Sequence, residues 1–283
     1  MNSDWWQKIR NFFFARWRSS RRTLHQERFS LPSTHLDRTV VLTLFYPQSH
    51  RGPLALLLLN DGQDIPALDL EPSLHQLWQA RQLPPLLVVG IHAGDRMQEY
   101  GTIGRADYAG RGNRAAAYAQ FVCQELLPYL EGRFRLRQPV RYRALAGFSL
   151  GGLSALDLVW QHPEYFGRVG VFSGSLWWRS TPFDPQRPDA DRIIHNRIAA
   201  GPRRPQLRFW LQAGTHDETA DRNNNGIIDA IDDTLDLIKV LEGVGYQRER
   251  DIVYEEVVEG KHHPRTWGRV MPQFLRWWVS GMK

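Results

Sequence analysis

The sequence predicts an α/β fold in which helices cover both faces of a mainly parallel central sheet. The first observation is a pair of short, uninterrupted apolar runs, Leu54 to Leu59 and Leu86 to Ile91. A strand that is apolar at every position has both faces covered, which is typical of parallel sheets. The second observation is that strand patterns and helical patterns alternate along the chain. Such alternation favours βαβ units, whose ligands bind beyond the carboxyl ends of the strands.

The opening segment differs from this pattern. Phe29 to Leu31 and Val40 to Phe45 have the β-branched and aromatic content of two short strands, and Pro47 ends the second. We expect this pair to be antiparallel. Later strands are predicted at Tyr142 to Ala146, Val169 to Phe172, Leu207 to Gln212 and Ile252 to Val258, and helices at 71–81, 114–131, 150–161, 230–243 and 270–279.

The composition predicts one globular domain behind an N-terminal extension. At 283 residues the chain lies near the upper size limit of a single core, and its 42% apolar and 23% charged residues are ordinary for a globular protein. We expect a basic, aromatic extension at residues 1–25 and one α/β domain at residues 26–283. The single cysteine, Cys123, excludes an internal disulfide framework, and its apolar neighbours place it on a buried helix face.

The net charge of +6 does not indicate a nucleic-acid partner, because the arginines are dispersed and no nucleic-acid motif accompanies them. Basic and aromatic residues alternate only in residues 5–22, as in a helix with one apolar face. We favour a helix docked on the domain, and weak contact with a membrane surface is the alternative. No apolar stretch is long enough to span a bilayer or to form a signal peptide, so we expect a cytoplasmic protein.

A glycine-rich turn after one predicted strand is the clearest chemical signal. Gly147-Phe148-Ser149-Leu150-Gly151-Gly152 follows a strand pattern and opens a helical one. In a G-x-S-x-G turn of this kind the strand and helix approach closely and the serine hydroxyl stands above the sheet. The Leu150 amide then lies at a helix N-terminus, where it can stabilise an oxyanion. Ser149 is therefore the predicted nucleophile, and a glycine-lined structural turn is the alternative.

A serine nucleophile needs a histidine base and an acid that orients it, and both types of residue follow later strands. The loop after Leu207 to Gln212 contains Asp217, our choice for the acid, and Glu218, the second candidate. The strand that ends at Val258 is followed by His262 and His263. Spacing alone does not distinguish these two histidines, and His216 is a more distant candidate for the base.

With these motifs in order, residues 38–280 resemble an esterase family of the α/β-hydrolase fold that includes esterase D, enterobactin esterases, feruloyl esterases and mycolyltransferases. The elbow Gly147 to Gly152 matches the family's G-x-S-x-G-G motif, and Asn60-Asp61-Gly62-Gln63 matches its oxyanion loop. The resemblance implies that the Gln63 amide is the second oxyanion donor. It also implies an esterase activity for the α/β domain, with a small-molecule ester as substrate and no required cofactor.

The resemblance narrows the choice of acid and base. Feruloyl esterases place the acid in a G-T-x-D segment, which Gly214 to Asp217 matches, and this favours Asp217 over Glu218. The family's base has a tryptophan five positions later, and Trp267 makes that histidine His262. The stretches 90–100 and 172–178 resemble segments that border the acyl pocket, so Trp177 and Trp178 are expected there. The implied reaction is acyl transfer in two steps, with Ser149 acylated and then released by water.

A second motif follows the acid segment and matches the ligand spacing of an EF-hand calcium loop. Oxygen ligands would come from Asp221, Asn223, Asn225, the Ile227 carbonyl, Asp229 and Asp232, with Gly226 at the sixth position. The departure is Asp232, where a longer glutamate is usual, and no clear helix precedes the loop. The alternative is a polar loop whose Asp229 or Asp232 caps the following helix. A calcium ion here would be structural and would fix the loop beyond Asp217.

Two other functions remain compatible with the same residues. An acyltransferase would use the same acyl-enzyme and let an alcohol, instead of water, intercept it. A binding protein on an inactive hydrolase fold is the alternative outside enzymes, and the complete set of Ser149, Asp217 and His262 argues against it.

Overall fold

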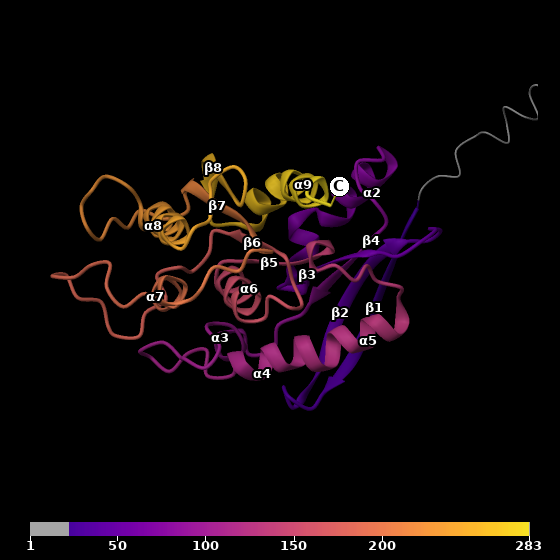
Figure 1. Ribbon diagram of the computed structural model, residues 1–283, viewed down its shortest axis with the longest axis horizontal. Coiled ribbons are helices and arrows are strands. Elements are labelled where there is room, and N and C mark those ends of the chain that lie inside the picture. The colour runs from indigo at the N-terminus through magenta and orange to yellow at the C-terminus, as the bar shows by residue number, and fades with distance from the viewer. Residues whose placement is uncertain (1–22, 283) are drawn as a thin grey trace, which may run out of the picture.

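Eight strands form one sheet in the order β1-β2-β4-β3-β5-β6-β7-β8, as a computed structural model of residues 23–282 shows (Figure 1). The strands are β1 (Leu24–Ser33), β2 (Arg38–Pro47), β3 (Ala55–Asn60), β4 (Leu86–Ile91), β5 (Arg143–Phe148), β6 (Arg168–Phe172), β7 (Arg208–His216) and β8 (Ile252–Lys261). Residues 5–22 lie outside the described part of the chain, so their docking and their membrane contact stay predictions, as does the domain boundary after residue 25.

The opening strands are antiparallel and the rest of the sheet is parallel. β1 pairs with β2 over their whole length, from Leu24 opposite Pro47 to Ser33 opposite Arg38, and β2 also runs antiparallel to β4. All later neighbours pair in parallel. The predicted antiparallel pair and the mainly parallel sheet are therefore confirmed. Both opening strands are longer than predicted, because exposed polar residues of β1 extend the pairing beyond its short apolar segment.

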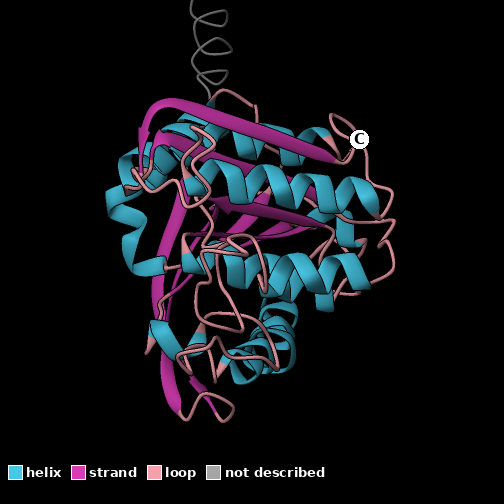
Figure 2. Cartoon of the chain, turned by 90° about the vertical axis from the view of Figure 1, so that its left-hand side faces the viewer, coloured by secondary structure: helices cyan, strands magenta, loops and turns pink. Residues whose placement is uncertain are grey.

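Helices and helical turns connect the parallel strands and cover both faces (Figure 2). They are η1 (Gly62–Leu68), α2 (Leu70–Gln79), α3 (Arg96–Glu99), α4 (Ala115–Gln120), η2 (Phe121–Leu126), α5 (Leu127–Arg133), η3 (Val140–Tyr142), α6 (Leu150–Gln161), α7 (Ile193–Ala200), α8 (Asp229–Gly243) and α9 (Pro264–Ser280). Among these described helices, none is long and apolar enough to cross a membrane.

Alternate residues of each buried strand enter two separate cores. In β3, Leu56 and Leu58 pack with α4, α5 and α6, whereas Leu57 and Leu59 pack with α2 and α9. Since successive side chains of a strand point to opposite faces, an apolar run supplies both cores at once. Figure 1 shows the resulting layers, with α4 and α5 on one side of the sheet and α2 and α9 on the other. The apolar runs were therefore a reliable signal for buried parallel strands.

The predicted helix 114–131 is found as one continuous stretch with an unusual middle section. Between α4 and α5, the segment η2 is π-helical. Cys123 lies on this segment and is buried as predicted, with no disulfide. Burial raises the pKa of its thiol to about 12. The cysteine is thus a core residue in its neutral form at physiological pH.

Candidate active site

The predicted site residues gather at the carboxyl edge of the sheet. Ser149 lies between β5 and α6, Asp217 follows β7, and His262 follows β8. Ser149, Asp217 and His262 line one cavity of about 270 Å³, together with Ser173, Gly174, Ser175, Trp177, Glu218 and Ala230. Two larger hollows, of about 530 and 700 Å³, are lined by arginine-rich surface and have no histidine or carboxylate among their described lining residues. Another, of about 330 Å³, is lined by Glu259 and His263 but by no serine. The cavity of about 270 Å³ is thus the one among these that brings together the predicted serine, carboxylate and histidine.

The backbone at Ser149 has the strained geometry that a nucleophile elbow requires. Its φ of 52° and ψ of −123° are unusual for a residue with a side chain. The Ser149 N–H donates to the Phe172 carbonyl at 2.9 Å, and the Ser175 N–H donates to the Ser149 carbonyl at 3.1 Å. These bonds hold the turn against the loop after β6. The Ser149 hydroxyl is partly exposed and lies 3.3 Å from the Ser175 hydroxyl.

The loop after β3 is fixed beside this turn by buried hydrogen bonds. The Asn60 amide donates to the Gly151 carbonyl at 2.8 Å and accepts a bond from the Tyr118 hydroxyl at 2.5 Å. The Asp61 N–H donates to the Tyr100 hydroxyl at 3.0 Å. A side chain at Gly151 would place its Cβ 2.5 Å from the Asp61 carboxylate, so only glycine fits there. The packing therefore holds the loop and the start of α6 in one arrangement.

Arg96 joins the same two segments from the side. Its guanidinium donates to both Asp61 carboxylate oxygens, at 2.8 and 3.0 Å, and to the Phe148 carbonyl at 3.1 Å. Asp61 is 1% exposed, and its bonds raise the pKa of Arg96 despite the burial that opposes the charge. A bidentate pair between arginine and carboxylate is among the strongest polar contacts in proteins. Sequence patterns do not predict this pair, although Asp61 lies in the oxyanion loop and Arg96 in the stretch 90–100.

The two predicted oxyanion donors lie at the starts of helical segments. Gln63 is the second residue of η1, and Leu150 is the first residue of α6. Within the described chain neither amide has a backbone hydrogen bond, which is expected for the first turn of a helix. The Gln63 side chain is itself fixed, because it donates to Asp61 and accepts from the Ala93 N–H, both at 3.1 Å.

Asp217 is held by its own loop and keeps one oxygen free. Its Oδ2 accepts from the Gly214 N–H at 2.8 Å, and its Oδ1 is buried without a hydrogen-bond partner in the described structure. A Cβ at residue 214 would lie 2.7 Å from that free Oδ1. An orphaned carboxylate oxygen beside a histidine is what an orienting acid has before its imidazole closes on it.

The structure separates the two adjacent histidines. His262 lines the cavity and packs edge-on against Trp267, with ring centroids 5.2 Å apart. His263 caps α9 instead, since its Nδ1 accepts from the Arg265 N–H at 3.1 Å. It lines a different hollow, with Lys261 and Arg269. His262 therefore shares a cavity with Ser149 and Asp217, whereas His263 has a structural partner.

The surroundings lower the pKa of His262. Desolvation by the surrounding protein is the main cause, the Asp217 carboxylate opposes it, and the Arg96 charge adds to the lowering. The imidazole is therefore neutral at physiological pH, as a general base must be. Among the described residues, no hydrogen bond links the His262 imidazole to Ser149 or to Asp217.

Three further predicted residues lie at or near the cavity. Trp177 is 38% exposed and lines it, in agreement with a pocket role. Trp178 does not reach the cavity, because it is fully buried against Gly101 and Gly112. The expectation that both tryptophans line the pocket is corrected for Trp178. His216 is exposed at the end of β7, and it is not among the residues that line the cavity.

The segment 221–232 has part of the arrangement that a calcium loop needs. The Asn225 and Gly226 amides donate to the Asp221 carboxylate, and the side-chain amides of Asn223 and Asn225 point to Asp232. Asp229 is turned toward Arg222, with which it forms an ion pair at 3.2 Å. Among the described residues, the three acidic groups close enough to share a metal are Asp189, Asp232 and Asp236, so only Asp232 belongs to the predicted set. Calcium binding stays a prediction.

The strand order, the elbow at Ser149 and the positions of Asp217 and His262 define a protein of the α/β-hydrolase fold. The chain belongs to the family described as "Putative esterase", whose profile matches residues 33–278. This confirms the family resemblance noted in the sequence.

Individual relatives agree with that assignment. The chain is 36% identical over 184 residues to an iron(III) enterobactin esterase of Escherichia coli O6:H1, covering 64% of this chain and 42% of that protein. It is similar in structure to the enterobactin esterase FES of Shigella flexneri, with 25% identity, a TM-score of 0.72, and coverage of 91% of this chain and 60% of that one. The siderophore hydrolase EstB of Aspergillus nidulans shares the fold, with 18% identity and a TM-score of 0.65. That match covers 89% of this chain and 95% of EstB. The chain spans less than half the length of its curated enterobactin esterase relatives.

Proposed function

We propose that this protein is a serine esterase that hydrolyses carboxylic esters through an acyl-enzyme on Ser149. The observation that carries the proposal is that one cavity brings together a strained serine, a histidine with a lowered pKa and a carboxylate with a free buried oxygen. Membership of an esterase family supports the reaction type. The substrates of the enterobactin esterases do not follow for this protein, because the chain matches only part of those proteins.

In the proposed reaction His262 takes the proton of the Ser149 hydroxyl as the oxygen attacks the ester carbonyl. The carbonyl oxygen becomes an oxyanion that the Gln63 and Leu150 amides stabilise, and Asp217 holds the imidazolium. Collapse of this intermediate breaks the ester bond, and His262 returns its proton to the leaving alcohol. Water then attacks the acyl-enzyme with His262 again as base, which releases the carboxylic acid and restores Ser149.

The proposal requires His262 to close on Ser149 and Asp217 when a substrate binds. Such tightening is common, because catalytic hydrogen bonds are often long or misaligned in the free enzyme. Ser175 has a corresponding role in the free state, since its hydroxyl lies 3.3 Å from the Ser149 hydroxyl and can hold it until the imidazole arrives. Water and an alcohol compete for the same acyl-enzyme. A hydrolase releases the free carboxylic acid and an acyltransferase releases a new ester, so the products distinguish the two activities.

The test uses a fluorophosphonate probe together with p-nitrophenyl esters from acetate to octanoate. We expect the wild-type protein to be labelled once and to hydrolyse at least one ester, and Ser149→Ala to lose both properties. Ser175→Ala is the matched control, because it removes the neighbouring hydroxyl of the same cavity. Label retained on Ser149→Ala and lost on Ser175→Ala would reverse the assignment of the nucleophile. Transfer of the acyl group to added alcohol in preference to water would identify an acyltransferase.

A further inference from the structure

The cavity beside Ser149 has an acidic lining that the proposed reaction does not need. Its described ionisable residues are Asp217, Glu218 and His262, and neither lysine nor arginine lines it. Asp217 and His262 belong to the catalytic set. Glu218 is therefore an additional carboxylate at the rim of the site.

Glu218 has no cationic partner among the described residues. Asp233, which lies nearby, is paired with Arg192 and Arg222, and Asp229 is paired with Arg222. Desolvation and the charges of Asp229, Asp233 and Asp217 raise the pKa of Glu218, and the Ala230 N–H at the start of α8 opposes them. Glu218 thus has carboxylates as neighbours and no cation of its own, and a group in this position attracts a positive ligand.

Trp177 supplies the second feature of a cation site. Its ring is 38% exposed and lines the same cavity as Glu218. Arg111 lies 5.4 Å from that ring, but Asp107 neutralises this arginine. Arg96, the other nearby cation, forms its ion pair with Asp61 and does not line the cavity. A partly exposed indole and a carboxylate without a cationic partner, both lining one cavity, are the kinds of group that bind quaternary ammonium ions.

We propose that the cavity selects esters whose alcohol part bears a cation, held between the Trp177 ring and the Glu218 carboxylate. The alcohol part is assigned to this cavity because His262, which must protonate the leaving oxygen, is one of its walls. This assignment replaces the expectation, drawn from the family resemblance, that Trp177 borders the acyl pocket. The inference rests on the proposed function and names the substrate class for the same site.

The test compares acetylcholine with 3,3-dimethylbutyl acetate, which has the same shape and no charge. At pH 8 and low ionic strength we expect kcat/KM to be about fivefold higher for the cationic ester, the size typical of partly exposed charge and cation–π contacts. Glu218→Gln keeps an oxygen for the Ala230 N–H and removes the charge, so the ratio of the two kcat/KM values falls toward one. Trp177→Leu also lowers the ratio.

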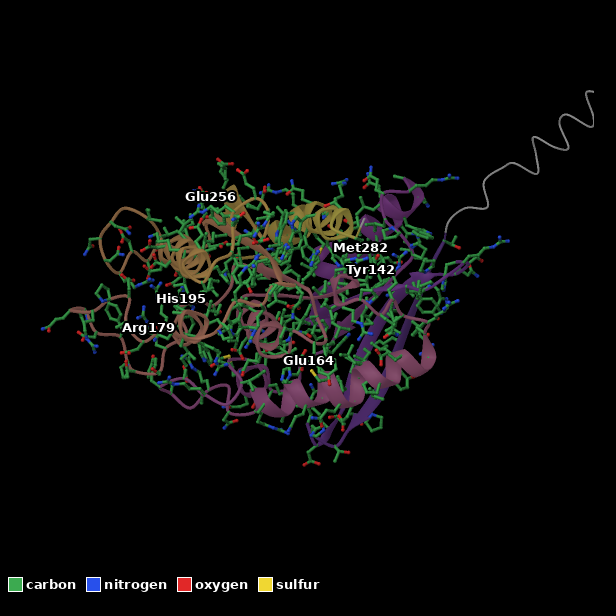
Figure 3. The ribbon with its side chains drawn as sticks, viewed as in Figure 1. Tyr142, Glu164, Arg179, His195, Glu256 and Met282 are labelled. Atoms are coloured by element: carbon green, nitrogen blue, oxygen red, sulfur yellow. The ribbon has the colours of Figure 1, made fainter. Side chains whose placement is uncertain are left out.

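Glu256→Gln is the matched control, because it removes one negative charge from the exposed outer edge of β8, outside the cavity (Figure 3). This variant keeps the wild-type ratio. A wild-type ratio of one or less, or a ratio that survives in Glu218→Gln, would overturn the inference.

A binding measurement separates failure of the inference from failure of the proposed function. Calorimetric titration with choline and with 3,3-dimethyl-1-butanol requires no turnover. Choline binding that Glu218→Gln weakens, in a protein that takes no fluorophosphonate label on Ser149 and hydrolyses none of the esters, supports the cation site and refutes the esterase. Hydrolysis of both esters with equal binding of the two alcohols supports the esterase and refutes the cation site.

Discussion

The two sides of the cavity differ in how firmly they are fixed. On one side, the loop after β3 and the elbow at Ser149 are joined by the Asn60 amide and by the Arg96 guanidinium. On the other side, His262 has no hydrogen bond to Ser149 or Asp217 within the described structure, and the Asp217 Oδ1 is unpaired. Under the proposed function, the oxyanion side is organised before substrate arrives, whereas the proton-transfer side is completed when substrate binds. The following predictions test that division.

The largest effect is expected from His262. His262→Gln removes the base, and in serine hydrolases loss of the base alone lowers kcat by about 10⁶-fold. His263→Gln is the matched control, because it removes only the acceptor that caps α9 and costs about 1 kcal/mol of stability. Ester hydrolysis and thermal melting measure the two effects. Equal loss of activity in both variants would mean that the two histidines are not divided between catalysis and capping.

The second-largest loss of kcat is expected from Asp217→Asn. An asparagine keeps the shape of the side chain but favours the wrong imidazole tautomer, so we expect kcat to fall about 10⁴-fold. The bond from the Gly214 N–H to Oδ2 can be retained by the amide oxygen, so the melting temperature should change little. Activity within tenfold of wild type would show that His262 is oriented by another group, and Glu218 would be the next carboxylate to test.

Arg96→Gln tests the fixed side of the cavity. The variant loses the bidentate contact with Asp61 and the bond to the Phe148 carbonyl, so the oxyanion loop is tied to the elbow only through the Asn60 amide among the contacts described above. We expect kcat to fall about 10- to 100-fold with a smaller change in KM, because the effect falls on transition-state geometry. Arg105→Gln, an exposed arginine of the neighbouring loop, should leave kcat unchanged. An effect confined to KM would instead make Arg96 a substrate-binding residue.

The acid limb of the pH profile follows from the lowered pKa of His262. The base acts when neutral, so activity should persist as the pH falls to values below about 6.5, the ordinary pKa of histidine. Because the Arg96 charge contributes to the lowering, Arg96→Gln should raise the pKa and move the acid limb of kcat/KM to higher pH. A limb that moves to lower pH would contradict this electrostatic account.

The smallest effect is expected at the loop 221–232. If the loop binds calcium as the sequence predicts, chelation lowers the melting temperature by a few degrees, and Asp221→Asn removes that response. Such a result would add a metal-dependent element to the less firmly fixed side of the cavity. Unchanged melting in chelator and in added calcium would leave the polar-loop interpretation.

The sequence was most informative where one local rule decides the structure. The apolar runs at β3 and β4 and the glycine-rich elbow at Ser149 each depend on nearby residues, and α6 was predicted with its observed bounds. The helix α7 was missed because its mixed sequence shows little amphipathic pattern.

Contacts between distant segments could not be predicted in the same way. The pairing of Arg96 with Asp61 joins residues 35 positions apart, and it depends on how the loops after β3 and β4 meet. The family resemblance of stretch 172–178 predicts both Trp177 and Trp178 at the pocket, yet adjacent residues of a loop can point in opposite directions. The order of serine, acid and histidine was predictable because each follows a strand whose carboxyl end lies on one edge.

The buried thiol on the π-helical segment also makes the protein its own reporter of unfolding. Cys123 is the single cysteine of the chain, and burial keeps its pKa near 12. A thiol reagent needs both access and the thiolate, so it will react with the folded protein only through opening of that helix. The rate of alkylation therefore measures the opening of the core directly, without any engineered probe, and can be followed while substrates fill the cavity beside Ser149.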